Sequence, residues 1–169
     1  MRDSRLSQDG TGKVRSFFTF PDPVNEVAAR AVAAGVVAMA GTVLVIRAWW
    51  VLWPLAYGFV ARVLAGPRLS PLARVAVHVV APRLAARPVP GPPKRFAQGI
   101  GAAVTTGALV AHYGLGADTI VLVLLAAMVV FATLEAVFGL CVGCKIFAGL
   151  VKLGWIPATS CETCNAPLI

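Results

Sequence analysis

Charged residues are scarce in this chain. Asp, Glu, Lys and Arg make up 13% of its 169 residues, whereas a typical soluble domain contains about 25%. Hydrophobic residues make up 59%, and the mean hydropathy is +0.82. The apolar residues also stand in long runs rather than at the spacing of one soluble core. The composition therefore argues against a soluble domain and predicts a membrane protein with a single domain.

Several features of common soluble proteins are also missing from the sequence. It contains no phosphate-binding glycine loop and no nucleophile elbow. Its net charge of +8 lacks the interleaved aromatic residues of a nucleic-acid surface, so we expect no nucleic-acid partner. The first apolar run starts only after Arg30, too late for a secretory signal peptide. Neither His78 nor His112 has a second histidine or a carboxylate at metal-ligand spacing, and both are expected to be polar anchors.

The apolar runs predict an all-α fold, a polytopic membrane protein with four transmembrane helices. One helix over residues 31–61 would be about 46 Å long, far longer than the hydrocarbon core of about 30 Å. A tight turn at Arg47 is therefore expected to separate two spans, with Trp49, Trp50 and Trp53 at the headgroup boundary. The four spans are expected at about residues 27–46, 48–65, 96–113 and 119–140, with the first helix starting at Asp22–Pro23.

The segments between and beyond these spans have a different character. From Arg62 to Arg95 the chain carries seven basic residues, no acidic residue and seven prolines, as expected of a connection rather than a span. Its middle, about residues 71–87, predicts an amphipathic helix on the membrane surface, and about 145–155 predicts a second interfacial helix. We expect residues 21–155 to form the membrane domain, residues 1–20 a disordered tail and residues 156–169 a C-terminal tail.

The basic connection also predicts the orientation. Basic residues concentrate on the cytoplasmic side of membrane proteins, and four spans would then place both termini in the cytoplasm. The expected location is thus the cell (inner) membrane, crossed several times. All cysteines would face the reducing cytoplasm, where thiol pairs are usually metal sites or redox-active groups.

A strip of small residues recurs every four positions in the third span. Small side chains allow membrane helices to approach closely, so this strip predicts a helix-packing face. A pore or a cofactor groove is the alternative. The strip consists of Gly99, Ala103, Gly107 and Ala111.

Four stretches of the sequence are similar to one protein family. They are residues 22–30, 70–74, 93–101 and 134–145, the last containing Cys141 and Cys144. Over roughly residues 20–150 the chain resembles a family of small bacterial membrane proteins that carries a domain-of-unknown-function label. Such proteins are often encoded beside thioredoxin-like and rhodanese-type sulfurtransferase genes, so the resemblance implies thiol or sulfur chemistry. The family's shared motif is the first cysteine pair, and the second pair departs from it.

The four cysteines form two Cys-x-x-Cys pairs separated by sixteen residues, Cys141 and Cys144 followed by Cys161 and Cys164. This spacing matches a four-thiolate zinc site, although the apolar segment between the pairs does not suit a zinc ribbon. The first pair could instead be a redox or sulfur-carrying dithiol, with the second pair as a relay. A third interpretation is that the thiols are small buried hydrophobic groups without chemistry.

The sequence leaves open whether the surroundings of the first cysteine pair favour a thiolate. Lys145 would favour a thiolate. If Cys141 ends the fourth span, it lies at the negative pole of that helix; if Gly139 breaks the helix, a new helix could begin near Cys141 and stabilise the thiolate. Glu135, six residues earlier, is expected to face the bundle, either paired with Arg62 or Arg95 or acting as a proton acceptor.

These observations predict an integral membrane protein that acts as a partner in thiol redox or sulfur transfer. Its expected partners are the lipid bilayer and a thioredoxin-like or sulfurtransferase protein. One alternative is a zinc-stabilised scaffold without catalysis, with all four cysteines as ligands. Another is a carrier of a small reduced-sulfur anion, with Arg62, Arg95 and Glu135 along its route.

Overall fold

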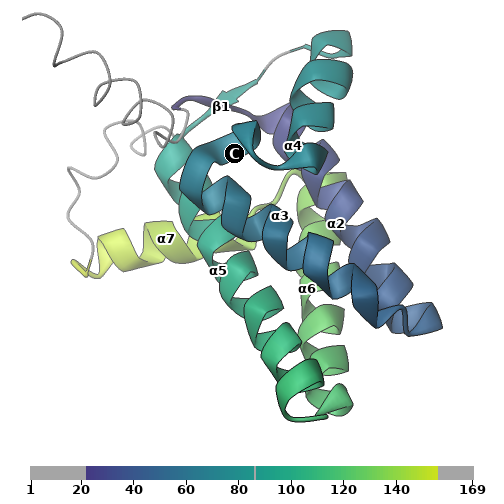
Figure 1. Cartoon of the computed structure of the whole chain (residues 1–169). Coiled ribbons are helices and arrows are strands. Elements are labelled where there is room, and N and C mark those ends of the chain that lie inside the picture. Colours follow the sequence, from purple (N-terminus) through teal and green to yellow (C-terminus); the bar gives the residue numbers. More distant parts are fainter. Residues whose placement is uncertain (1–21, 86, 156–169) are drawn as a thin grey trace, which may run out of the picture.

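The computed structural model describes residues 22–85 and 87–155 and is mostly helical (Figure 1). Four long helices run side by side, and a fifth, α7, leaves the bundle sideways near one end. The helices are α2 (Glu26–Ile46), α3 (Leu52–Ala65), α4 (Pro71–Val75), α5 (Gly91–Leu109), α6 (Asp118–Phe138) and α7 (Val142–Lys152). The all-α class is thus confirmed for the part of the chain that the structure describes.

Shorter helical turns extend several of these helices. A 3-10 turn at Trp49–Val51 precedes α3, and another at Gly66–Arg68 follows it. Helix α4 continues as a π-helical turn at Ala76–Val80 and a 3-10 turn at Ala81–Arg83. Helix α5 likewise continues as a π-helical turn at Val110–Gly114.

A two-residue β ladder joins the starts of α2 and α5. Strand β1 (Val24–Asn25) pairs antiparallel with β2 (Pro88–Val89), so Val24 lies opposite Val89. The backbone N–H of Gly91 also donates to Asp22 Oδ1 at 3.0 Å. This clamp fixes the first turn of α5 beside α2, at the end of the bundle that carries α4.

The helix boundaries follow local chemistry. Asn25, rather than Asp22, caps α2, because its side chain accepts from the backbone N–H of Val27 at 3.0 Å. Arg47 ends α2 in the left-handed conformation with φ 56°, so the chain turns there. Helix α5 begins at Gly91, and its first turn contains two prolines, which suit that position.

The core lies between α2 and α6 on one side and α3 and α5 on the other. It contains Val43, Leu52, Leu55, Val121 and Leu125, all fully buried. Helices α3 and α5 approach closely at Gly101, where a Cβ atom would lie 2.2 Å from the Phe59 ring.

Most of the small-residue strip lies off the packing face of α5. Ala103 and Gly107 are exposed, and a Cβ atom at Gly99 or Gly107 would meet nothing within 4 Å. The packing face instead follows Gly101, Thr105 and Ala108, because the side chains of α3 lie against that side. Of the predicted strip, Ala111 belongs to the buried core, whereas Gly99, Ala103 and Gly107 do not.

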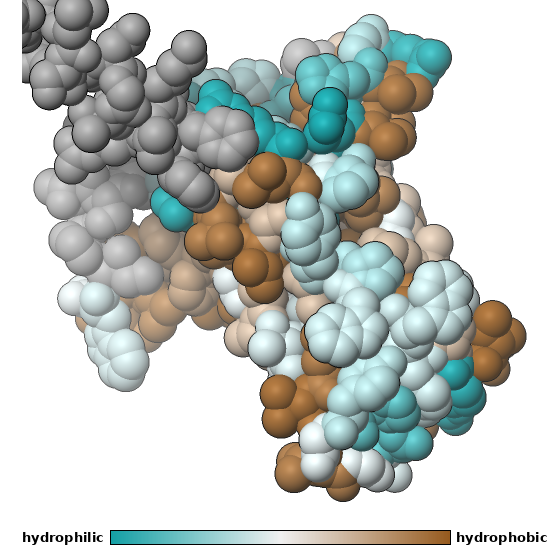
Figure 2. All heavy atoms as spheres, in the orientation of Figure 1, coloured by the Kyte–Doolittle hydropathy of each residue, from teal (hydrophilic) through white to brown (hydrophobic). Residues whose placement is uncertain are grey.

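Two of the described helices, α2 and α6, are long and apolar enough to cross a membrane. Their most apolar stretches have mean hydropathies of 2.0 and 2.7, yet only 28% and 17% of those residues are buried. In the view of Figure 2, apolar and weakly polar residues cover the middle of the bundle, and the most hydrophilic residues gather toward its ends. Helix α3 alone has 14 residues, fewer than the roughly 20 that a membrane span needs. The helical turn at Trp49–Val51 directly precedes it and extends the helical stretch to Trp49–Ala65.

The segments predicted around the spans have counterparts with different bounds. The helical stretch that begins at Pro71 ends at Arg83, where a helix over residues 71–87 was expected. Helix α7 begins at Val142, where an interfacial helix was expected from residue 145. The tails expected at residues 1–20 and 156–169 lie outside the described residues.

Candidate functional site

The first cysteine pair lies at the start of α7. Helix α6 ends at Phe138, and Gly139 adopts φ 71°, a left-handed conformation that glycine takes without strain. Cys141 then caps α7, with its Sγ accepting from the backbone N–H of Cys144 at 3.3 Å. Of the two alternatives left open by the sequence, the structure has the one that places Cys141 at the positive pole of a new helix.

Arg30 holds the end of α6 in place. From α2, its Nε donates to the carbonyl oxygen of Ala136 at 3.0 Å, and its Nη2 donates to that of Val137 at 2.7 Å. These carbonyls belong to the last turn of α6, which has no intrahelical donors left for them. Arg30 therefore stabilises the point at which the chain leaves α6 and turns toward the cysteines.

The start of α7 packs directly on α5. A Cβ atom at Gly143 would lie 2.6 Å from the Cβ of Ala97 and 2.8 Å from its Cα, so a glycine is required between the two cysteines. Further along, the rings of Phe96 and Phe147 lie 5.6 Å apart. The two helices thus fix both thiols against the first turns of α5.

The two thiols are free, buried and unequal. Their side-chain hydrogen bond lowers the pKa of Cys141 and, together with burial, raises the pKa of Cys144. The nearby Lys94 ammonium lowers both pKa values, and the Glu135 carboxylate raises both. Cys141 is therefore the thiol that ionises first, and Cys144 is the proton donor beside it.

Glu135 forms an ion pair with Lys94, with Nζ and Oε1 2.6 Å apart. The side chains are 8% and 17% exposed, so the pair is largely removed from water. The direct ion pair is with Lys94 rather than with the expected Arg62 or Arg95. Arg62 Nε donates to Gln98 and Arg95 Nε donates to the carbonyl oxygen of Val63, although Glu135 also attracts Arg62. Lys94 was missed because it was assigned to the connection before the third span, whereas it lies in the first turn of α5.

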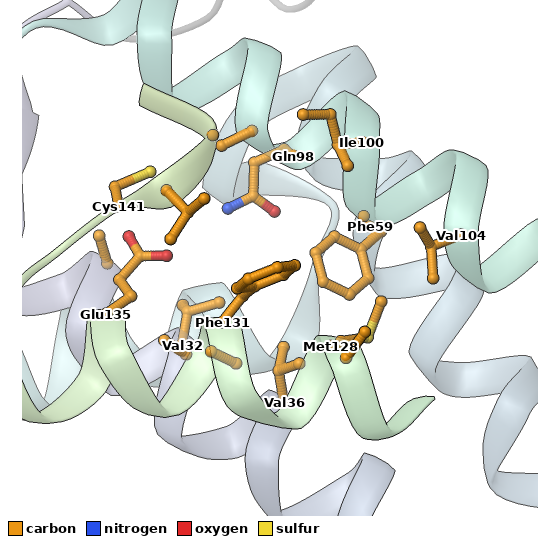
Figure 3. A pocket seen from close by; sticks show the side chains of 18 of the residues that line it. Val32, Val36, Phe59, Gln98, Ile100, Val104, Met128, Phe131, Glu135 and Cys141 are labelled. Atoms are coloured by element: carbon orange, nitrogen blue, oxygen red, sulfur yellow. The ribbon is translucent and has the colours of Figure 1, made fainter. Parts of the chain in front are cut away.

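A cavity of about 190 Å³ opens beside Cys141 and Glu135 (Figure 3). Its wall is mostly apolar and comes from α2, α3, α5, α6 and α7. Cys141 and Glu135 lie together at one end, the Gln98 amide projects inward, and the side chains of Phe59 and Met128 lie toward the other end. The thiol with the lowered pKa thus faces an apolar space with only a few polar groups.

The other predicted site residues lie elsewhere. Cys161 and Cys164 fall outside the described residues, so the zinc site and the relay stay predictions. Among the residues that the structure describes, no group of three or more His, Cys, Asp or Glu side chains could hold a metal ion. His112 lies in the turn between α5 and α6, with Nδ1 2.6 Å from Asp118 Oδ1 and its ring stacked on Trp49.

Comparison with protein families shows the family to which the chain belongs. The family model described as a domain of unknown function (DUF4395) matches residues 24–152, well over half of the sequence. The chain belongs to this family. The match includes Lys94, Glu135, Cys141 and Cys144 and ends before the second cysteine pair. No curated protein and no solved structure matches the chain.

Proposed function

We propose that this DUF4395 protein is an integral membrane protein that acts as a partner in thiol redox or sulfur transfer through Cys141 and Cys144. The observation that carries the proposal is the position of Cys141 at the first turn of α7, where its sulfur accepts the backbone N–H of Cys144. Helix N-termini and neighbouring cations lower thiol pKa values, and the thiolate is the nucleophile in thiol chemistry. Lys94 supplies the cation, and its partner Glu135 acts on the pKa of Cys141 in the opposite direction.

The two cysteines have complementary roles in the proposed reaction. The Cys141 thiolate attacks one sulfur of a disulfide in a thioredoxin-like partner, and the partner's other sulfur leaves as a thiolate. Cys144 then loses its proton to that leaving sulfur and attacks Cys141 Sγ, which releases the partner's first sulfur as a thiolate that takes a proton from solvent. The partner is thereby reduced by two electrons, and Cys141 and Cys144 are oxidised to a disulfide.

Sulfur transfer would use the same nucleophile. The Cys141 thiolate attacks the outer sulfur of a persulfide on a sulfurtransferase, the partner's thiolate leaves, and a persulfide remains on Cys141. The apolar wall of the adjoining cavity supports this version as well, because it lowers the exposure of the persulfide to water. Both versions use Cys141 as the attacking group and differ in what Cys144 does next.

The same proposal places the protein in the cell membrane with four spans and both termini in the cytoplasm. The support is the outward-facing apolar surface of α2 and α6, together with the basic residues at the end of the bundle that carries α4. The aromatic residues Trp49, Trp53 and Tyr113 gather at the opposite end, as in an interfacial belt.

Metal analysis and redox titration of the full chain test the thiol function. Protein purified without chelator should contain less than stoichiometric zinc, and the Cys141–Cys144 pair should titrate reversibly near the cytosolic poise of roughly −220 to −320 mV. Cys144→Ser should trap a mixed disulfide with a soluble partner, whereas Cys141→Ser should trap none. One zinc per chain, with four thiols masked until denaturation, would replace the redox proposal with the zinc scaffold.

A further inference from the structure

Arg62 is a buried cation with one unsatisfied nitrogen. Its side chain is 4% exposed and lies over the Phe59 ring, with the guanidinium carbon 4.4 Å from the ring centroid. Nε donates to Gln98 Oε1 at 2.7 Å, and Nη1 donates to Ser70 Oγ at 3.2 Å. Nη2 is buried and has no hydrogen-bond partner among the described residues. A buried donor that makes no hydrogen bond costs free energy, which indicates that an acceptor belongs beside it.

A cavity adjoins the Arg62 side chain. Its volume is about 230 Å³, several times the roughly 30 Å³ that one water molecule occupies. Arg62 and Lys94 both line it, and none of the described residues in its wall is acidic. Its remaining wall comes from β1, α2, α4 and the turn after α3, including Asn25, Ala73 and Pro67.

The charges around the cavity do not balance. Lys94 is paired with Glu135, and one of its three ammonium protons is used in that contact. Arg62 makes no hydrogen-bonded ion pair, because the oxygens to which it donates belong to the neutral side chains of Gln98 and Ser70. Glu135 also attracts Arg62, so one carboxylate serves two cations and one positive charge is left over among these three residues. A water molecule could accept from Nη2 without neutralising that charge.

We propose that this cavity binds a small tetrahedral oxyanion of sulfur or phosphorus, held by Arg62 Nη2 and the Lys94 ammonium. An oxyanion supplies the two things that the site lacks, an acceptor atom for Nη2 and a negative charge. Guanidinium groups form their strongest hydrogen bonds with such anions, and an ammonium adds a second point charge. The same chemistry describes a free anion and the phosphate of an anionic lipid, and the site does not depend on the proposed thiol function.

Equilibrium dialysis of the full chain in neutral detergent tests the free anion. Radiolabelled sulfate, thiosulfate and phosphate are the probes, each with excess chloride present. We expect one oxyanion to bind per chain. Arg62→Gln should weaken binding at least tenfold. The affinity of Arg62→Lys should lie between those of the wild type and Arg62→Gln. Arg74→Gln is the matched control, since it removes one positive charge from an exposed position of α4 and should bind as the wild type does.

A lipid source is tested in parallel. The same dialysis is done in nanodiscs of phosphatidylglycerol and of phosphatidylcholine, and lipid phosphorus is measured in purified protein. If a lipid occupies the site, free anions should fail to bind in phosphatidylglycerol nanodiscs but still bind in phosphatidylcholine nanodiscs. The lipid phosphorus retained by purified protein should then be lower in Arg62→Gln. Either source supports the site.

A second variant guards against misfolding of Arg62→Gln. Val77→Phe would fill part of the cavity while leaving Arg62 in place, and it should also abolish binding. Unchanged binding in a folded Arg62→Gln or Val77→Phe protein would overturn the proposal. The proposal would also be overturned if the protein showed neither saturable oxyanion binding nor retained lipid phosphorus. Competition for the site by chloride as strong as that by sulfate would overturn it as well.

Discussion

Cys141 and Cys144 are the same kind of residue three positions apart, and their environments make them different. Cys141 accepts a backbone N–H at the start of a helix, and Cys144 sits one turn inside it. A side-chain hydrogen bond between the thiols lowers the pKa of the first and raises that of the second. Lys94 reinforces the effect on Cys141, so the lysine that pairs with Glu135 also acts on the thiol.

Lys94→Met is predicted to affect both stability and thiol reactivity. It leaves the buried Glu135 carboxylate unpaired, which should lower the free energy of unfolding by on the order of 3 kcal/mol. It also removes the cation that lowers the pKa of Cys141, so this pKa should rise. Thermal unfolding in detergent measures the first effect. The rate of alkylation by iodoacetamide against pH measures the second, with Cys161 and Cys164 replaced by Ser.

The controls separate the two effects of Lys94. Lys152→Met removes an exposed lysine at the end of α7 and should change neither measurement. The double variant with Lys94→Met and Glu135→Leu should recover most of the stability, because neither member of the Lys94–Glu135 ion pair is then left without its partner. An alkylation profile of Lys94→Met that coincides with the wild type would contradict the proposed influence of Lys94 on Cys141.

At the scale of elements, the placement of the thiols depends on how closely α7 approaches α5. Gly143 lies where the two helices touch, and the atoms opposite it include the backbone of Ala97. A backbone atom cannot move aside as a flexible side chain can. The spacing between α5 and α7 is therefore set by the absence of a side chain at this one position.

Gly143→Ala is predicted to push the start of α7 away from α5. A Cβ atom 2.8 Å from Ala97 Cα requires a backbone shift, which should cost about 1–3 kcal/mol of stability. The shift would separate Cys141 from Lys94 and slow its alkylation near neutral pH. Gly149→Ala, in the same helix with nothing within 4 Å, is the matched control and should be neutral or stabilising. Equal behaviour of both variants would show that the close approach does not control the thiols.

The elements that could be predicted from sequence are those with strong local signals. Helices α2 and α6 follow from long uncharged runs, and the turn at Arg47 follows from the length that one helix would otherwise have. The start of α5 was missed, because prolines are equally compatible with a spacer and with a first helical turn. That error hid Lys94, which lies in the same turn.

The rest of the site depends on contacts between distant segments. Whether Cys141 ends one helix or begins the next depends on Gly139, whose conformation accompanies the contacts of Arg30 with the end of α6. The burial of Arg62 depends on Gln98 and Ser70, one from another helix and one from the connection after α3. Spacing along the chain carries no signal for such contacts.

At the scale of the whole molecule, the two ends of the bundle differ in chemistry. One end carries the Lys94–Glu135 pair, the cysteines, the β ladder and the basic stretch around α4. The other carries Trp49 stacked on His112 and Trp53 packed against Tyr113. The surface between them is apolar along α2 and α6. The proposed topology, with the basic end in the cytoplasm, predicts such a difference between the two ends.

Single-cysteine labelling tests this orientation. In a variant without the four native cysteines, Leu115→Cys and Ala85→Cys place one thiol at each end of the bundle, both at exposed positions. An impermeant maleimide applied to intact spheroplasts should label position 115 and leave position 85 unlabelled. Permeabilised cells, in which both must react, control for accessibility. Labelling of position 85 in intact spheroplasts would place the basic connection outside. Cys141 and Cys144, at the same end, would then face an oxidising compartment, and a stable disulfide would be expected instead of a reduced, reactive pair.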